Sequence, residues 1–419
     1  MDYKIINCNN YNIYLVKTNK FKTINISTVF ISEFKKDEIT KDKFISEYLV
    51  NSNNKTKDEV SMSKKFMELY EPSISVYDFY NDMHHKIYGT TFLNEKYTEK
   101  GMNKKTIDFY FDVIFNPNID NKEFDEKNYN IIMNKMKSWY KLDEEDSRSM
   151  AYFNSLSYIK DDIPIRIDTR GNIEDLLKIK RNDLKDYYFN KLNKSEVAVF
   201  IVGDYNDDLI NIIKSNLNGK VNKNNYDLKN VFNIKKVNKV QNIIEEKEFN
   251  QSIIYLIYKI YNMTDRERYY VLPVLNNILG GSSAKLFNNV REKNSLAYYA
   301  YSGYSPSNNI LYMYAGISKE NYEKCVELMK KQLEEIKNGN ITDRELKDSL
   351  KTLDSGILSN FDNVGVISNN LKGQIFFNLP SLDMLKKEYS TVTKEEVIEL
   401  SFKMDLDIEY LLKGVKEWK

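Results

Sequence analysis

Histidine is nearly absent from this 419-residue chain, which contains only His84 and His85. The two are adjacent and lie in Met83–Phe92, a run that predicts a strand. Neighbouring side chains of a strand point to opposite faces of its sheet, so the two rings cannot both bind one metal ion. We therefore expect one partly buried and one exposed histidine, and no metal site built on them.

Cysteine and long apolar runs are equally scarce. Cys8 and Cys325 are the only cysteines, and they lie too far apart to form a metal or redox motif. The longest dense apolar run, Val197–Val202, is far shorter than the ~20 residues that a membrane-spanning helix needs. The start, Met1–Ile5, lacks the basic and apolar regions of a signal peptide. We expect a reduced, cytoplasmic protein with no membrane span.

Neither sign of charge is in excess. Lys and Arg number 62 and Asp and Glu 61, and no basic block stands out, which argues against a nucleic-acid partner. Apolar residues make up 42% and charged residues 29%, as in an ordinary globular protein, and the length predicts two or three domains. The abundance of Lys, Asn, Ile and Tyr indicates a bacterial source with an AT-rich genome.

The predicted elements run through the same order twice. Predicted strands Ser73–Tyr80 and Leu296–Gly303 correspond, as do two predicted helix starts, Ile119–Glu123 and Ile341–Glu345, with offsets of 223 and 222 residues. This repetition predicts an α+β protein of two homologous halves, each a mostly antiparallel sheet packed with helices. We place them at residues 1–215 and 235–419, with the polar segment 216–234 as the linker. The helices expected are Thr40–Val50, Glu59–Leu69, Lys104–Phe115, Asn121–Lys141, Ser147–Ile159, Ile173–Asn190, Arg266–Leu279, Ser283–Arg291, Glu320–Asn338, Thr342–Asn360, Val364–Asn378 and Lys394–Phe402.

Glycine is also scarce, with 14 residues, and its only adjacent pair is Gly280-Gly281. The pair follows a predicted helix and is most simply a C-terminal stop that uses glycine's access to left-handed backbone conformations. A flexible lip beside a peptide cleft is the second interpretation. A dinucleotide loop is excluded, because there is no third glycine at the required spacing.

Arg291 and Tyr298 follow this pair, on a predicted helix and at the start of a predicted strand. A guanidinium offers planar, permanently charged donors for a carbonyl or carboxylate, and a phenol can donate a hydrogen bond to a developing oxyanion. Tyr299, Tyr301 and Tyr304 have no such support and are expected to pack or to line a groove.

The segment Leu279–Tyr298 resembles the C-terminal signature of the insulinase/pitrilysin zinc peptidases, in which Arg and Tyr stand in a run like R-E-K-x-x-L-A-Y. Phe66–Val76 and Met136–Tyr140 are similar to the inactive-partner branch of bacterial two-subunit systems. The resemblance implies the short, dimer-forming type, with two LuxS-metallohydrolase-like halves of ~200 residues each.

Active members of this family need the inverted zinc motif H-x-x-E-H, whose histidines at i and i+4 share one helix face and whose Glu is the general base. Phe44, Glu47 and Tyr48 stand at these positions, so only the base is matched. The resemblance places a third zinc ligand on the helix that we expect to contain Glu123 and Glu126. Without the histidines, the resemblance implies no catalytic zinc in this chain.

These features predict the non-catalytic subunit of a heterodimeric insulinase-like metallopeptidase that processes small peptides. The partner would be a homologous zinc-bearing subunit, and the substrate an unfolded peptide held as an added strand. Arg291 and Tyr298 would act in trans, and the chain would be inactive alone. The competing hypothesis is a structural or peptide-binding scaffold with no catalytic contribution.

Overall fold

The computed structural model describes residues 2–229, 231–282 and 284–415, and its chain forms two compact units. Of the predicted helix Ser283–Arg291, Ser283 lies outside the described residues. The first unit contains Met1–Lys141, Thr169–Leu228 and Phe361–Phe377, and the second contains Leu142–Asp168, Lys229–Asn360 and Asn378–Lys419. Most of each unit comes from one half of the sequence, on either side of the proposed linker. A short segment of each half, 142–168 or 361–377, belongs to the other unit.

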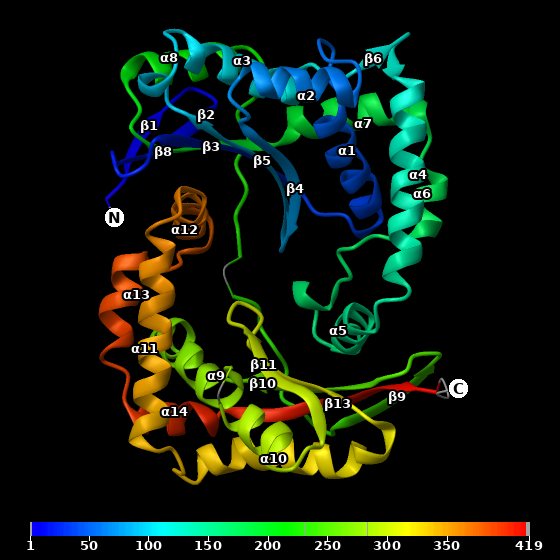
Figure 1. The fold of residues 1–419 in the computed structure, drawn as a ribbon, viewed down its shortest axis with the longest axis vertical. Coiled ribbons are helices and arrows are strands. Elements are labelled where there is room, and N and C mark those ends of the chain that lie inside the picture. Colours follow the sequence, from blue (N-terminus) through cyan, green and yellow to red (C-terminus); the bar gives the residue numbers. More distant parts are fainter. Residues whose placement is uncertain (1, 230, 283, 416–419) are drawn as a thin grey trace. The chain divides into compact units, whose positions relative to one another are not determined.

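The first unit is built on a six-stranded sheet with the order β1-β2-β8-β3-β5-β4 (Figure 1). The β2–β8 pair is parallel and the other pairs are antiparallel. β3 and β8 are buried almost throughout, as expected for central strands covered on both faces. The strands are β1 (Lys4–Asn7), β2 (Tyr11–Lys17), β3 (Thr23–Glu33), β4 (Ser73–Tyr80), β5 (Met83–Leu93) and β8 (Glu196–Gly203).

The second unit contains a five-stranded sheet with the order β11-β12-β10-β13-β9. Its one parallel pair, β13–β9, is in the same place as β8–β2 of the first sheet. The order thus repeats that of β4-β5-β3-β8-β2, which confirms the prediction of two similar sheet-plus-helix halves. The strands are β9 (Gln241–Lys247), β10 (Ser252–Ile260), β11 (Ala297–Ser305), β12 (Ile310–Ile317) and β13 (Met404–Gly414).

Helices follow the strands in matching order in the two halves. Those of the first half are α1 (Ile39–Asn51), α2 (Glu59–Glu68), α3 (Met102–Phe115), α4 (Glu126–Asp143), α5 (Ser147–Ser157), α6 (Ile173–Lys178), α7 (Arg181–Lys194) and α8 (Asp207–Leu217). Those of the second half are the π-helical turns Glu267–Val271 and Phe287–Glu292, and α9 (Leu272–Gly280), α10 (Tyr322–Lys337), α11 (Asp343–Asn360), α12 (Val364–Phe377), α13 (Leu382–Tyr389) and α14 (Lys394–Ser401).

Two helix predictions of the first half were wrong in detail. The segment expected to start a helix at Ile119–Glu123 forms a small hairpin, β6 (Ile119–Asp120) with β7 (Glu123–Phe124). Asn121 and Lys122 form its two-residue turn with positive φ values of 47° and 69°, so the following helix, α4, starts later. The helix expected over Ile173–Asn190 is divided into α6 and α7 by extended backbone at Ile179. β1, β9, α8 and α13 were not predicted.

Helices α5 and α12 are exchanged between the two halves of the sequence: each belongs to the unit that the other half builds. α5 precedes α6 in the first half of the chain, yet it packs on β10 and β13 of the second unit. α12 precedes α13 in the second half, yet it packs on β8 and β3 of the first unit (Figure 1). The ring centroids of Tyr152 on α5 and Tyr312 are 5.8 Å apart, and those of Phe376 on α12 and Phe200 are 5.4 Å apart. Each sheet is thus completed by a helix from the other half of the sequence.

No helix in the described part of the chain is long and apolar enough to cross a membrane.

Candidate functional site

Helix α1 carries the three residues at the zinc-motif positions. Phe44 and Tyr48 are both fully buried. The ring of Tyr48 stacks on that of Phe124, with centroids 4.4 Å apart, and its hydroxyl donates to the carbonyl oxygen of Asn118 at 2.6 Å. The same hydroxyl accepts from the backbone N–H of Asp125 at 2.8 Å. The two aromatic side chains therefore hold α1 against the start of α4.

Glu47, at the position of the general base, is held by a lysine of α4. Its carboxylate is 3.1 Å from the ammonium of Lys135, which also lies 4.8 Å from the centroid of the Trp139 ring. A general base must take a proton from a bound water, and this carboxylate is already neutralised by a cation. Glu47 thus retains the family's residue type without a free carboxylate.

The two candidates for a third zinc ligand are not on one helix. Glu123 lies on β7, where its carboxylate is 2.6 Å from the guanidinium of Arg181. Glu126 is exposed in the first turn of α4. The expectation of a shared helix was wrong, because the hairpin turn separates the two residues.

Both histidines are buried, each with an exposed fraction of only 1%. The expectation that one would be exposed was wrong, because β5 lies between β3 and β4 and both faces of the sheet are covered there. His85 packs against Phe376 and Phe377 of α12, at centroid distances of 5.5 and 5.4 Å. Burial in this aromatic environment lowers the pKa of His85 to about 3, so its ring is neutral near pH 7.

His84 lies on the other face, in a buried ionic cluster. Its Nε2 is 2.7 Å from Asp78 Oδ1, and its Nδ1 is 3.5 Å from Asp42 Oδ2. Lys86 pairs with Asp78 and Lys191 with Asp42, each at 2.9 Å. Although burial alone raises it, the pKa of Asp78 is held well below its usual value by the Lys86 ammonium and the hydrogen bond from His84.

This cluster has the composition of a metal site but not its electrostatics. Ligand atoms of Asp42, Asp78 and His84 lie within 4.8 Å of one another. However, the imidazole directs a different nitrogen at each carboxylate, and two ammonium groups already neutralise both of them. A divalent cation would have to displace these lysines, so the cluster is better explained as a buried ion network. The sequence feature that could have indicated this ion network is a charged residue inside each of two strands, Asp78 in β4 and Lys86 in β5.

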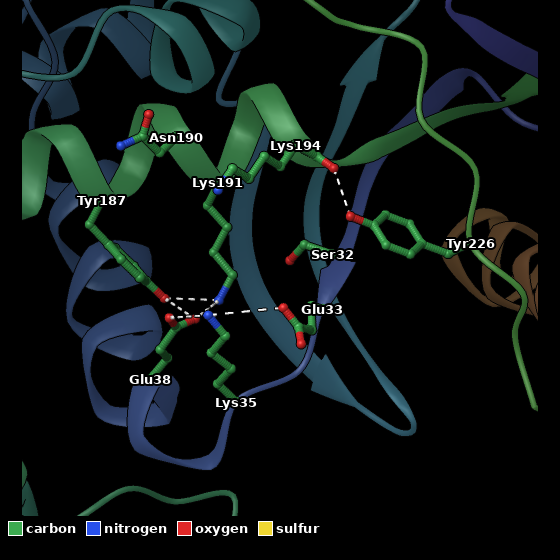
Figure 2. Close-up of a pocket in the computed structure, with 9 residues that line it drawn as sticks. All are labelled: Ser32, Glu33, Lys35, Glu38, Tyr187, Asn190, Lys191, Lys194 and Tyr226. Carbon is green, nitrogen blue, oxygen red and sulfur yellow. Dashed lines mark hydrogen bonds and ion pairs between the residues drawn. The ribbon is translucent and has the colours of Figure 1, made fainter.

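A cavity of about 220 Å³ opens beside this cluster, between β3 and α7 (Figure 2). Lys191 bonds to Glu38 at 2.9 Å, and the hydroxyl of Tyr187 is within hydrogen-bonding distance of the same carboxylate. The carboxylate of Glu33 is 3.9 Å from the ammonium of Lys35. The two acidic groups of the cavity, Glu33 and Glu38, are thus each paired with a lysine. The lining residues are Ser32, Glu33, Lys35, Glu38, Tyr187, Asn190, Lys191, Lys194 and Tyr226.

Arg291 and Tyr298 belong to one short helix–turn–strand in the second unit. Arg291 lies on the π-helical turn Phe287–Glu292, with its guanidinium 4.9 Å from the ring centroid of Phe287, and its side chain is 43% exposed. Tyr298 is the second residue of edge strand β11 and is 60% exposed. Its hydroxyl is 3.2 Å from Ser318 Oγ. Both side chains project into solvent, and neither contributes to the core.

Gly280 and Gly281 end α9, as predicted, but not by a left-handed conformation. Neither has a positive φ. Gly280 is required for space, because a Cβ at this position would lie 2.2 Å from the backbone nitrogen of Ser302 on β11. Gly281 lines a cavity of about 700 Å³ that α9 and α11 border. The pair therefore allows α9 to approach the strand that carries Tyr298.

Replacing Gly280 by Ala should lower the free energy of unfolding by about 1–3 kcal/mol, because the added methyl group forces α9 away from β11. The control is Gly356→Ala, within α11, where a Cβ would meet nothing within 4 Å. That change should instead stabilise the protein by about 0.5–1 kcal/mol through helix propensity. Denaturant titration measures both, and equal midpoints for wild type and Gly280→Ala would contradict the packing explanation.

Comparison with known proteins agrees with this geometry. The family profile described as "Peptidase M16 inactive domain" matches residues 178–353, a range that contains the Gly pair, Arg291 and Tyr298. The "Probable inactive metalloprotease YmfF" of Bacillus subtilis strain 168 is 25% identical over 411 residues, covering 96% of each chain. The "Uncharacterized zinc protease YmxG" of the same organism is 26% identical over 303 residues, covering 70% of each.

Solved structures share the fold along the whole chain. A conserved protein from Enterococcus faecalis V583 superposes with a TM-score of 0.89 at 23% identity and covers 100% of both chains. A peptidase M16 inactive domain from Pseudomonas fluorescens has a TM-score of 0.77 at 17% identity, covering 100% of this chain and 99% of its own. The chain therefore resembles inactive-type members of the insulinase family, the M16 peptidases, in sequence, and it shares their fold.

Proposed function

We propose that this chain is the zinc-lacking subunit of a two-chain insulinase-type peptidase that cleaves small unfolded peptides. In this arrangement a homologous partner supplies the zinc, both histidines and the general base. The chain described here supplies Arg291 and Tyr298 to the substrate held at the partner's zinc. The observation that carries the proposal is a contrast in burial. Tyr48, at a zinc-motif position, is fully buried, whereas Tyr298, in the Arg/Tyr motif, is 60% exposed.

The first support is the loss of every ligand at the zinc-motif positions. Phe44 and Tyr48 offer no imidazole, and both side chains are packed against aromatic rings, those of Tyr129 and Phe124. Lys135 adds a positive charge beside Glu47, which disfavours a second cation there. A chain with these features depends on another subunit for hydrolysis.

The second support is the chemistry of the exposed pair. The phenol of Tyr298 can donate a hydrogen bond to the oxyanion that forms when water attacks a peptide carbonyl. The guanidinium of Arg291 can hold a carbonyl or carboxylate of the substrate in a fixed orientation. Arg291 forms an ion pair with the adjacent Glu292 at 3.6 Å, and because both side chains are largely exposed, this pair holds the guanidinium only weakly.

The sheet edges fit an extended peptide as substrate. β4 and β11 are edge strands of their sheets, and each presents one side for added pairing. Along β4 the residues alternate between exposed and half-buried, with Tyr77 and Phe79 exposed by 41% and 44%. Backbone pairing on such an edge suits a peptide in extended conformation.

The purified chain alone should contain no stoichiometric zinc and should cleave no peptide, because aromatic side chains occupy the ligand positions. Elemental analysis of the purified protein and a peptide-cleavage assay check this. The zinc-bearing relative, prepared in the same way, is the positive control. One tightly held zinc per chain, with activity that a chelator abolishes, would overturn the prediction.

The proposal as a whole is tested by reconstitution. Mixing the chain with its cognate zinc-bearing subunit should yield peptidase activity that neither shows alone. The Tyr298→Phe, Arg291→Ala double variant should still form the complex but lose most of this activity. Full activity of the double variant would contradict the shared site and favour the alternative, a scaffold with no catalytic contribution.

A further inference from the structure

The cavity between β3 and α7 contains a buried hydroxyl that the described protein does not use (Figure 2). Ser32, the last residue but one of β3, is only 5% exposed, and its side chain lines the cavity. Its hydroxyl forms no hydrogen bond with any residue that the structure describes. Buried hydroxyl groups nearly always have a partner, so this one is available to a molecule that enters the cavity.

Two lysines of the same cavity are also incompletely paired. Lys191 is fully engaged, because it bonds to Glu38 at 2.9 Å and to the buried ion network described above. Lys194, one turn further along α7, has no ion pair among the described residues. Lys35 is 3.8 Å from Glu38 and 3.9 Å from Glu33, which is beyond hydrogen-bonding distance. Lys35 and Lys194 can therefore still donate hydrogen bonds to an anion.

The acidic groups of the cavity limit the charge that this anion can carry. Although burial raises it, the pKa of Glu38 is held below its usual value by the hydrogen bond and charge of Lys191, so its carboxylate is ionised at neutral pH. A doubly charged phosphate near Lys35 would be repelled by the carboxylates of Glu33 and Glu38. A singly charged carboxylate experiences half of that repulsion. The charges of the cavity therefore favour a monoanion.

The size of the cavity suits a small organic molecule. Its volume of about 220 Å³ exceeds the ~150 Å³ that accommodates benzene. The rings of Tyr187 and Tyr226 both line it (Figure 2). The hydroxyl of Tyr226 donates to the carbonyl oxygen of Lys194 at 2.9 Å, which fixes this ring beside the end of α7. The cavity thus offers aromatic surface together with hydrogen-bond donors.

We propose that this cavity binds a small organic monocarboxylate. The carboxylate accepts hydrogen bonds from the hydroxyl of Ser32 and the ammonium of Lys194, and the apolar part of the ligand lies against the ring of Tyr226. The site belongs to the first unit, whereas the proposed peptidase residues Arg291 and Tyr298 belong to the second. A failure to bind a carboxylate would therefore leave the reconstitution of peptidase activity untouched, and the reverse holds as well.

Isothermal titration calorimetry of the whole chain with sodium benzoate tests the class of ligand. Benzoate should bind saturably at one site. Benzamide has the same shape without the charge, and inorganic phosphate carries more charge, so each should bind at least about tenfold more weakly. Absence of saturable benzoate binding, or equal affinity for benzamide, would overturn the proposal. Phosphate that binds as tightly as benzoate would contradict the choice of a monocarboxylate.

Two variants test the residues that hold the ligand. Ser32→Ala should weaken benzoate binding about fivefold, the effect of one neutral hydrogen bond, without lowering the free energy of unfolding, because the hydroxyl has no described partner. Lys194→Gln should weaken binding by about tenfold or more, because a charged donor is lost.

The matched control is Lys185→Gln, which lies on the same helix but does not line the cavity and should leave benzoate binding unchanged. Denaturant titration of each variant checks that it is folded. Equal benzoate affinities of the Lys194 and Lys185 variants, or wild-type affinity of Ser32→Ala, would contradict the proposed contacts.

Discussion

Replacing Tyr298 by Phe should reduce the kcat of the reconstituted peptidase by roughly 10²-fold, the usual effect of removing one oxyanion donor. The change deletes only a hydroxyl, and that hydroxyl has Ser318 as its protein neighbour at 3.2 Å. Because the side chain is 60% exposed, the protein should not lose stability. Steady-state kinetics on the mixed complex provides the measurement, with kcat and KM determined separately.

The matched control for this variant is Tyr301→Phe, three residues further along β11 and without a proposed role. It should leave kcat unchanged. Arg291→Ala should act differently and raise KM, because its guanidinium is proposed to position the substrate, and Arg291→Lys should restore little because the planar fork is lost. If Tyr298→Phe and Tyr301→Phe have the same kcat as wild type, the phenol takes no part in the reaction.

Asp78→Ala should lower the free energy of unfolding by about 3–5 kcal/mol, the usual cost of removing one partner from a buried ion pair. The carboxylate accepts from Lys86 at 2.9 Å, from His84 at 2.7 Å and from Ser46 at 2.6 Å. Removing it leaves a buried ammonium and a buried imidazole without their acceptor. The control is Glu68→Ala, which breaks an exposed pair with Lys65 and should leave stability nearly unchanged.

The effect of Asp78→Ala should depend on pH in a defined direction. The pKa of Asp78 is lowered in the folded protein, so its carboxylate contributes its full stabilisation above the unfolded value of about 4. As the pH falls below this value, the unfolded chain takes up a proton that the folded one does not, and the stabilisation is lost. The difference in unfolding free energy between wild type and variant should therefore shrink from pH 5 toward about pH 2. A constant difference over this range would exclude ionisation of Asp78 as its cause.

Elements with a strong local pattern could be predicted from the sequence. β4, β5 and α12 were predicted to within about one residue, because apolar periodicity and turn residues define such segments locally. The hairpin turn at Asn121-Lys122 was missed because its residues also suit a helix start. The burial of both histidines was missed because it depends on α12 covering a distant sheet, and no local pattern reports such a contact.

Candidate site residues could be predicted from the sequence only where they lie close together along the chain. Arg291 and Tyr298 lie seven residues apart, so a linear motif singles them out as candidates, and their catalytic role stays a prediction. The buried cluster of Asp42, Asp78 and Lys191 joins α1, β4 and α7, and its members are separated by up to 149 residues. Asp42 and Lys191 each lie on a helix with many polar residues, where a charged residue is ordinary, and only the fold shows that they meet.

The exchange of α5 and α12 affects what happens when the chain is split into its two halves. A gene cut near residue 228 would encode two polypeptides, each carrying a helix that completes the other's sheet. Each product alone would expose an aromatic sheet face that includes Phe200 in one and Tyr312 in the other. If the two fragments associate, we expect these helices to be the contacts through which each completes the other's sheet. Loss of either half of the sequence would therefore also remove a helix that covers the sheet of the half that remains.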